Sequence, residues 1–88
     1  MRVEWSNRAL DDADKLDSQT RHRIYNGIDR FADTGHGDAK KLAGSSGHLR
    51  LRVGQYRVRF IYDASSGERI LIVLRVLPRD RAYRDSDD

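Results

Sequence analysis

The feature that most constrains the fold is a run of alternating apolar and charged residues on both sides of Gly54-Gln55. The run extends from His48 to Tyr62, and its period of two is typical of strands with one buried face. A Gly at the first position of a two-residue connection favours a type II′ hairpin turn. That turn fixes the register of an antiparallel hairpin, with the pairs Val53–Tyr56, Arg52–Arg57, Leu51–Val58 and Arg50–Arg59.

This register places four guanidinium groups on one face of the hairpin, in directly opposed pairs. Like charges in that arrangement destabilise a sheet, so we expect an anionic partner to occupy the face. Of the 17 Lys and Arg residues, eleven lie in residues 39–84 with only three carboxylates, and 14 of the 17 are Arg. Arg binds phosphate in a bidentate manner. Such a basic region favours nucleic acid, acidic membrane or an acidic protein as partner, although a merely solvated sheet face stays open.

The rest of the chain predicts two helices and two further strands. Val3 and Trp5 indicate a short first strand, Arg2 to Trp5. Apolar residues at helical spacing predict helices after the candidate N-caps Ser6 and Asp17 or Ser18, running to about Leu16 and to Thr34-Gly35. Four glycines predict a loop over 35–47. The apolar run Arg69 to Leu77 predicts an internal strand that Pro78 ends, and residues 80–84 predict one helical turn.

These elements predict a single α+β domain over residues 1–88, in the order β-α-α-β-β-β. We expect a small antiparallel sheet with a helical hairpin packed on one face and a short C-terminal helical turn. The absence of Cys excludes disulfides and thiolate metal sites. The first residues lack the apolar run of a signal peptide, and Ile70 to Leu74 is too short to cross a membrane. We therefore expect a cytoplasmic protein.

Two segments carry a resemblance to a known family: Leu49 to Tyr62, and Ile72 to Arg84 with its Arg-x-x-x-Tyr-Arg ending. Together with the length and element order, they resemble the RelE/ParE superfamily of bacterial toxins over nearly the whole chain. The resemblance implies a small α+β toxin of a type II toxin–antitoxin system. Members of the RelE branch cleave mRNA in the ribosomal A site, whereas members of the ParE branch inhibit DNA gyrase.

The resemblance also implies a set of site residues. Arg50, Arg57, Arg79 and Tyr83 match the RelE-branch nuclease site. His48 stands where relatives often carry Lys, and Pro78 where they often carry Lys or His. No cofactor is implied. The three His residues have no metal-ligand spacing, so no metal site is expected.

Metal-free RNA cleavage uses the 2′-hydroxyl as nucleophile and needs a base, an acid and positive charge on the phosphorane oxygens. We assign Arg57 and Arg79 to the scissile phosphate and Arg50 to an auxiliary phosphate contact, since Arg does not readily give up a proton. A neutral His48 imidazole could act as the base, and Tyr83 could stack on a splayed base or transfer a proton. Which group is the acid and which the base stays open. The Arg57→Ala and Arg79→Ala variants should each lose activity and stay folded, because truncation of an exposed Arg usually costs little stability.

The remaining basic residues of the second half are predicted to contact RNA backbone, ribosomal RNA or solvent: Arg52, Arg59, Arg75, Arg81, Lys40 and Lys41. The expected partners are mRNA, the ribosome and a cognate antitoxin with an acidic, partly disordered segment that lies in the groove between helices and sheet. Two other functions stay open: a ParE-like gyrase inhibitor without nuclease activity, and a degenerate toxin that only binds RNA.

Overall fold

The helices begin and end where the local sequence provides caps. The computed structural model describes residues 1–44 and 47–79. Helix α1 (Asn7–Asp14) begins at Ser6, whose side chain accepts a hydrogen bond from Ala9 N at 3.1 Å. Helix α2 (Ser18–Thr34) begins at Asp17 and ends at Gly35, whose φ of +76° gives the predicted left-handed cap. The first helix is thus shorter than predicted, since it ends at Asp14 and not near Leu16.

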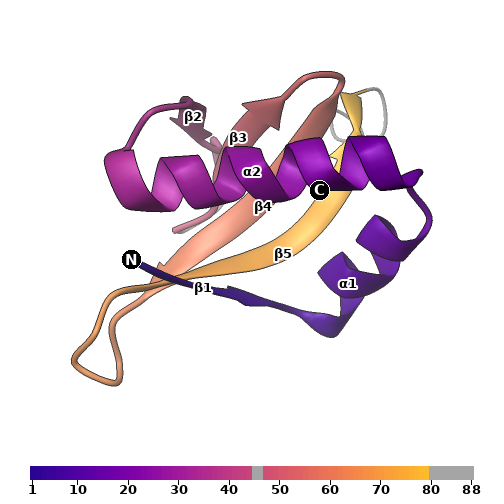
Figure 1. Ribbon diagram of the computed structural model, residues 1–88. Helices are drawn as coiled ribbons and strands as arrows, with labels where there is room; N and C mark the ends of the chain where they lie inside the picture. Colours follow the sequence, from indigo (N-terminus) through magenta and orange to yellow (C-terminus); the bar gives the residue numbers. More distant parts are fainter. Residues whose placement is uncertain (45–46, 80–88) are drawn as a thin grey trace.

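The strands form one five-stranded sheet in the order β1-β5-β4-β3-β2 (Figure 1). Their bounds are β1 (Arg2–Trp5), β2 (Asp38–Lys41), β3 (Leu49–Val53), β4 (Tyr56–Asp63) and β5 (Ile70–Pro78). The β3–β4 hairpin has the four pairs predicted from the sequence. Gly54 has a φ of +58° and Gln55 does not have a positive φ, as a type II′ turn requires.

Two expectations about the sheet were wrong. The sheet is mixed and not purely antiparallel, because β1 pairs with β5 in parallel. The segment predicted as a loop over 35–47 contains β2, which pairs antiparallel with β3 at the edge of the sheet. β2 carries the sequence Asp-Ala-Lys-Lys, which has low strand propensity, so its pairing with β3 and not its own preference gives the strand. The predicted C-terminal helical turn lies outside the described residues.

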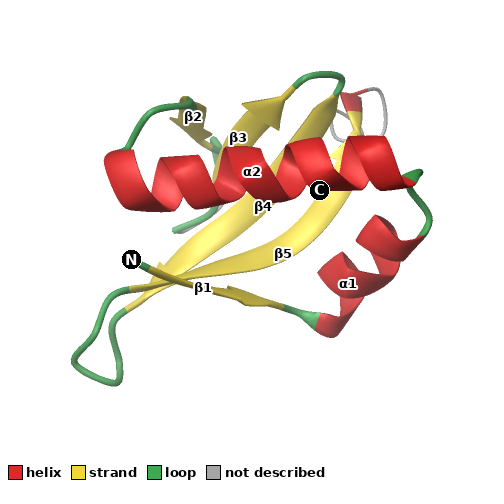
Figure 2. Cartoon of the chain, viewed as in Figure 1, coloured by secondary structure: helices red, strands yellow, loops and turns green. Residues whose placement is uncertain are grey.

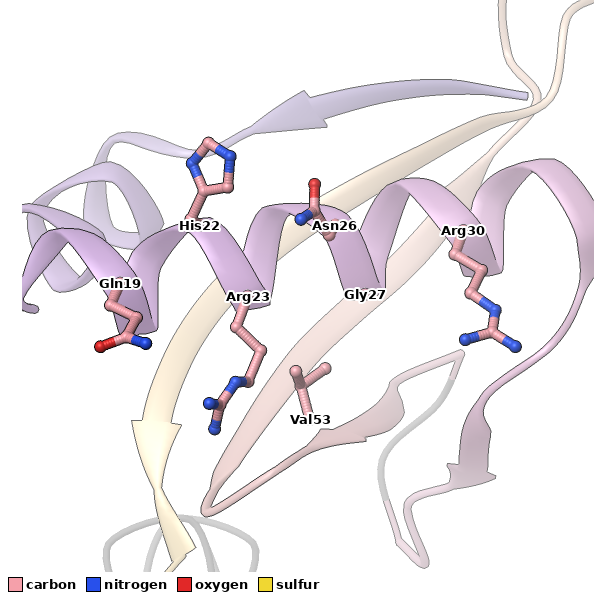
Figure 3. Close-up of a pocket in the computed structure, with 7 residues that line it drawn as sticks. All are labelled: Gln19, His22, Arg23, Asn26, Gly27, Arg30 and Val53. Atoms are coloured by element: carbon pink, nitrogen blue, oxygen red, sulfur yellow. The ribbon is translucent and has the colours of Figure 1, made fainter.

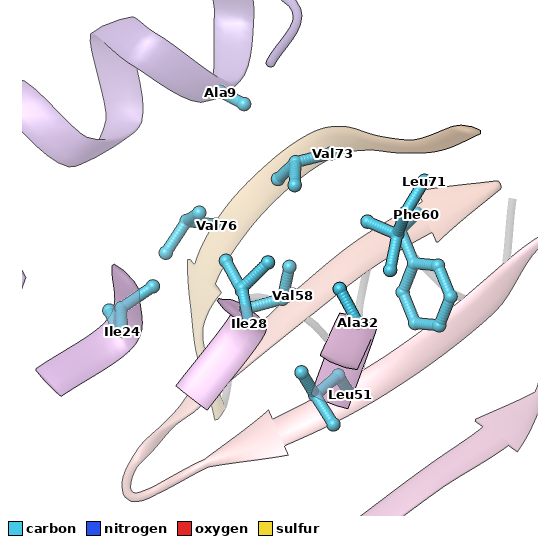
Figure 4. Close-up of a cluster of buried hydrophobic side chains, with 10 residues drawn as sticks. All are labelled: Ala9, Ile24, Ile28, Ala32, Leu51, Val58, Phe60, Leu71, Val73 and Val76. Atoms are coloured by element: carbon cyan, nitrogen blue, oxygen red, sulfur yellow. The ribbon is translucent and has the colours of Figure 1, made fainter. Parts of the chain in front are cut away.

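Both helices lie on the same side of the sheet, α2 across the strands and α1 beside β5 (Figure 2). The core lies between them and the sheet, where Phe60, Val58 and Val73 are fully buried (Figure 4). Phe60 also meets Phe31 of α2 edge to face, with ring centroids 5.6 Å apart. The opposite side of the sheet has no helix over it within the described residues, so its side chains decide what else the domain contacts. No helix in the described ranges is long and apolar enough to span a bilayer.

Candidate nucleic-acid interface

The uncovered side of the sheet carries rows of cationic residues. Residues paired across adjacent strands share a face, so the Arg50–Arg59 and Arg52–Arg57 pairs place four guanidinium groups on the side opposite the buried Leu51 and Val58. The flanking strands extend the first of these rows, because Lys40 of β2 pairs with Arg50 and Arg75 of β5 pairs with Arg59. We call this surface the arginine face; its members are Lys40, Arg50, Arg52, Arg57, Arg59 and Arg75.

The hairpin arginines of this face are not neutralised by carboxylates of the described chain. Within residues 1–44 and 47–79, the ion pairs are Arg2–Glu4 and Arg75–Asp12. Asp38 stands opposite Arg52 in the register but makes no ion pair with it. Among the described residues, the buried Nε atoms of Arg50, Arg57 and Arg59 have no hydrogen-bond partner. The four hairpin arginines therefore bring positive charge together without a carboxylate partner in this part of the chain.

Arg57 departs from the expectation of an exposed phosphate ligand. Only 3% of the residue is exposed, and its Nη1 donates to Tyr56 O at 3.2 Å. An ionised group in such a position loses hydration and gains little in return. The assumption that an Arg57 truncation would be structurally silent because the side chain is exposed was therefore wrong.

A β-bulge places Arg75 on the arginine face. Phe60 pairs with Val73 and Arg59 with Arg75, so Leu74 has no partner on β4. Without this extra residue, Arg75 would share the face of Val73 and point into the core. Arg75 Nε donates to Asp12 Oδ2 at 2.8 Å and its Nη2 to Oδ1 at 3.2 Å. Unlike the hairpin arginines, Arg75 thus already has a carboxylate partner.

Asp12 also accepts a hydrogen bond from Val76 N at 2.9 Å. Burial of Asp12 acts to raise the pKa of its carboxyl, but the hydrogen bonds from Arg75 and Val76 N, with the charges of Arg75 and Lys15, outweigh it and leave the pKa lowered. The carboxylate is therefore held ionised and joins α1 to the strand just past the bulge.

His48 lies in a cavity of about 380 Å³ that borders the arginine face. The lining includes Arg59 and Arg75 from the sheet, Leu74 of the bulge, and Ser6, Asn7 and Arg8 at the start of α1. The Nδ1 atom of His48 is buried without a hydrogen-bond partner among the described residues. The structure thus brings His48 and Arg59 together in one cavity. Arg8, which was not predicted as a site residue, also lines this cavity. In the sequence, Arg8 is marked only as a basic residue in the first turn of a predicted helix.

The other predicted site residues lie in different places. Arg79 is exposed, and its backbone N–H donates to Gln55 O at 2.9 Å, which places it beside the hairpin turn. Lys41 pairs with Leu49 and so faces the helix-bearing side, away from Lys40 and the arginine face. Tyr83 and Arg81 lie outside the described residues.

A second basic surface lies between α2 and the β3–β4 hairpin. A groove of about 510 Å³ follows the helix here, with Arg23 and Arg30 pointing from α2 toward the side of Val53 (Figure 3). Adjoining hollows reach His36 and Arg52 at one end and Gln55 and Tyr56 at the other. The sequence signal for this groove is the seven-residue spacing of Arg23 and Arg30, which puts both on one side of the helix.

The family defined as the ParE toxin of the type II toxin–antitoxin system parDE matches residues 3–83 of the chain. The chain belongs to this family. The predicted membership of the RelE/ParE superfamily is therefore confirmed, and the domain is a toxin-family domain. No protein of curated function matches the chain significantly.

Solved structures of the superfamily share the fold of this toxin-family domain. A chain of the RelB-RelE antitoxin–toxin complex from Methanococcus jannaschii is 24% identical, with a TM-score of 0.72 over 93% of this chain and 96% of that one. The YoeB/ParE toxin from Agrobacterium tumefaciens is 21% identical, with a TM-score of 0.71 over 89% and 98%. A chain of the RelBE2 complex from Mycobacterium tuberculosis is 26% identical, with a TM-score of 0.61 over 89% and 96%.

Proposed function

We propose that this chain is a metal-independent endoribonuclease toxin that cleaves mRNA at the ribosomal A site. The single observation that carries the proposal is the arginine face, where Arg50, Arg52, Arg57 and Arg59 have no carboxylate partner in the described part of the chain. Maintaining this opposition of like charges lowers the stability of the sheet. A polyanion on the surface offsets that cost, and a ribose–phosphate backbone also provides the 2′-hydroxyl that metal-free cleavage needs.

In this proposal, cleavage proceeds by attack of the ribose 2′-oxygen on the adjacent phosphorus. The 2′-hydroxyl gives its proton to a base, the bond from phosphorus to the 5′-oxygen breaks, and an acid protonates the leaving oxygen. The products are a 2′,3′-cyclic phosphate and a 5′-hydroxyl. His48 is the candidate base because its ring lines a cavity beside Arg59.

The arginines in this proposal stabilise negative charge on the phosphorane. Arg79 and Arg50 contact phosphate oxygens from the hairpin end and the middle of the face. Arg57, which is buried, raises the positive potential beneath them and reaches the scissile phosphate only if its surroundings open. Tyr83 keeps its predicted part as a stacking or proton-transfer group. Arg52, Arg59 and Lys40 contact the flanking backbone.

An antitoxin is the expected protein partner. Structural neighbours from Methanococcus jannaschii and Mycobacterium tuberculosis are toxin–antitoxin complexes. In this chain, the basic groove between α2 and β3 suits an acidic segment that orders on binding. Such a segment would leave the arginine face on the other side of the sheet to be covered by a different part of the antitoxin.

A second function, inhibition of DNA gyrase without RNA cleavage, is favoured by one observation. The family that matches the chain is that of the ParE toxin. A third, RNA binding without cleavage, is favoured by Pro78, which cannot transfer a proton and stands where the resemblance leads us to expect Lys or His. Both alternatives would use the same cationic surface.

One experiment separates the three functions. The chain is expressed from an inducible promoter, mRNA 5′ ends are mapped, and gyrase supercoiling is measured with the purified chain. We expect arrested translation, new 5′-hydroxyl ends and unaffected gyrase, with loss of cleavage in Arg79→Ala. Arg69→Ala is the matched control, because Arg69 lies at the opposite end of the sheet and stacks on Tyr62 at 4.0 Å. Intact transcripts would contradict the nuclease proposal, and inhibited supercoiling would favour the gyrase alternative.

A further inference from the structure

The bulge at Leu74 is fixed by the start of α1. Ser6 N donates to Val73 O at 2.9 Å, and Ser6 Oγ donates to Leu74 O at 3.0 Å. Asp12 holds the other side of the bulge through Val76 N and Arg75. Four consecutive residues of β5, from Val73 to Val76, are therefore hydrogen-bonded to α1 or its N-cap residue.

Part of this junction lines the cavity that also contains His48, and the lining combines apolar and cationic groups. Leu74 and the His48 ring provide flat or apolar surface, and Arg8 and Arg59 provide positive charge, whereas Arg75 is already paired with Asp12. Two polar atoms at the cavity, His48 Nδ1 and Arg59 Nε, are buried without hydrogen-bond partners among the described residues. Among the described residues that line the cavity, none is a carboxylate. These features favour an anionic ligand with a ring.

The volume and position of the cavity limit which anionic ligands with a ring could bind there. At about 380 Å³ it is within the range of small-ligand pockets, roughly 300–1,000 Å³. Arg59 and Arg75 belong both to its lining and to the row that contains Arg50, so a chain bound along this row would lie next to the cavity. Asn7 and Arg8, in the first turn of α1, add the partial positive charge of a helix N-terminus to that of the side chains. A single nucleotide of an RNA chain has the ring and the negative charge that the lining favours. Its backbone also connects it to a chain bound along the arginine face.

We propose that the cavity is a nucleotide subsite that binds one nucleotide of single-stranded RNA next to the scissile phosphate. The base lies against Leu74 and the His48 ring, and its phosphate contacts Arg8 and Arg59. This subsite rests on the proposed function, since it presumes RNA on the arginine face. It assigns Arg8 a binding role that is separate from the catalytic residues.

The test measures binding of a single-stranded RNA hexanucleotide with 2′-O-methyl riboses, which cannot be cleaved. We expect amide chemical shifts of residues 6–8 and 74–75 to change on titration, and Arg8→Glu to weaken binding about tenfold. The matched control is Arg30→Glu, which makes the same charge change on α2 facing the other groove, and should weaken binding less than twofold. With cleavable RNA, Arg8→Glu should raise KM and leave kcat within twofold.

Since this readout is binding, its outcome is independent of whether the chain cleaves RNA. A chain that shows the expected shifts but leaves cleavable RNA intact would support the RNA subsite and contradict the nuclease. Unchanged shifts at residues 6–8 in a chain that binds or cleaves RNA would overturn the subsite. Equal effects of Arg8→Glu and Arg30→Glu would also overturn it, as would an acidic peptide of equal charge that shifts the same amides as strongly. Absence of RNA binding would overturn both proposals.

Discussion

The two faces of the sheet are built from the same strands and differ in every physical respect that matters for function. On one face, Leu51, Val58 and Phe60 are buried under α2 and need no other partner. On the other, Arg50, Arg57 and Arg59 alternate with them along the same strands and have no carboxylate within the described residues. The first face holds most of the buried apolar side chains, whereas the second opposes like charges, although Leu77, which pairs with Arg57, is also buried there. This difference supports the proposal that the arginine face binds an anionic ligand.

The largest change in the free energy of unfolding should follow from a substitution on the helix-covered face. Phe60→Ala removes a fully buried ring that meets both Phe31 and Tyr62, and should cost about 3–5 kcal/mol in the free energy of unfolding. Ile61→Ala, the adjacent residue pointing the other way and only partly buried, is the control and should cost clearly less. Urea denaturation measures both. Equal costs would contradict the division into a core face and a ligand face.

The next effect concerns the ion pair between Asp12 and Arg75, a member of the arginine face. Asp12→Asn should cost about 1–3 kcal/mol at pH 7, because Arg75 and Val76 N lose a charged acceptor. The folded-state pKa of Asp12 is lowered, so its contribution is complete above the unfolded value of about 3.9 and is lost as pH falls through the folded pKa. Parent and variant should therefore converge in urea titrations below about pH 4.

The neighbouring Asp11 provides the control for this prediction, since it is exposed and makes no ion pair with a described residue. Asp11→Asn should change the free energy of unfolding by less than about 0.5 kcal/mol. A difference between parent and Asp12→Asn that persists unchanged at pH 3 would show that the Asp12 carboxylate is not what holds the bulge.

A smaller effect should appear in the salt dependence of RNA binding. Each phosphate contact on a single strand contributes a slope of about 0.7 to the fall of log K with log salt concentration. Arg50→Ala should reduce the slope by about that amount, whereas Arg69→Ala, at the far end of β5, should leave it unchanged. Binding isotherms at several salt concentrations measure the slope. Equal slopes for parent and Arg50→Ala would mean that Arg50 does not contact phosphate.

The smallest change in stability should follow from a substitution at Gly27, where α2 crosses β3 on the helix-covered face. A Cβ there would lie 3.0 Å from Val53 Cγ2, so the gain of about 1 kcal/mol in helix propensity is opposed by crowding. Gly27→Ala should change stability by less than about 0.5 kcal/mol in thermal or urea unfolding. A gain of the full propensity difference would show that α2 and β3 are not closely packed at this point.

The elements that could be predicted from the sequence are those specified by local chemistry. The hairpin register follows from the Gly54-Gln55 turn, and α2 from its Asp17 and Gly35 caps. The bulge at Leu74 could not be predicted, because it lies in a nearly continuous apolar run. In such a run, apolar and polar residues do not alternate, so the sequence does not show where the side chains change face. The parallel pairing of β1 and the existence of β2 depend on neighbouring strands, and no local pattern specifies them.

The candidate site divides in the same way. The opposed arginines were predictable because strand alternation and the turn fix their face. The burial of Arg57, the Asp12–Arg75 ion pair and the cavity around His48 and Arg8 arise from residues distant in sequence, so they required the three-dimensional structure.

The most direct test of the central claim is Arg57→Met, measured for unfolding and for RNA binding in the same preparation. Met retains an unbranched apolar stem like that of Arg57 but lacks the guanidinium group and its buried charge. We predict a gain of about 1–3 kcal/mol in the free energy of unfolding, since a packed apolar chain replaces a buried cation that has no carboxylate partner among the described residues, together with weaker RNA binding and loss of cleavage. A variant that is less stable than the parent and binds RNA equally well would contradict it.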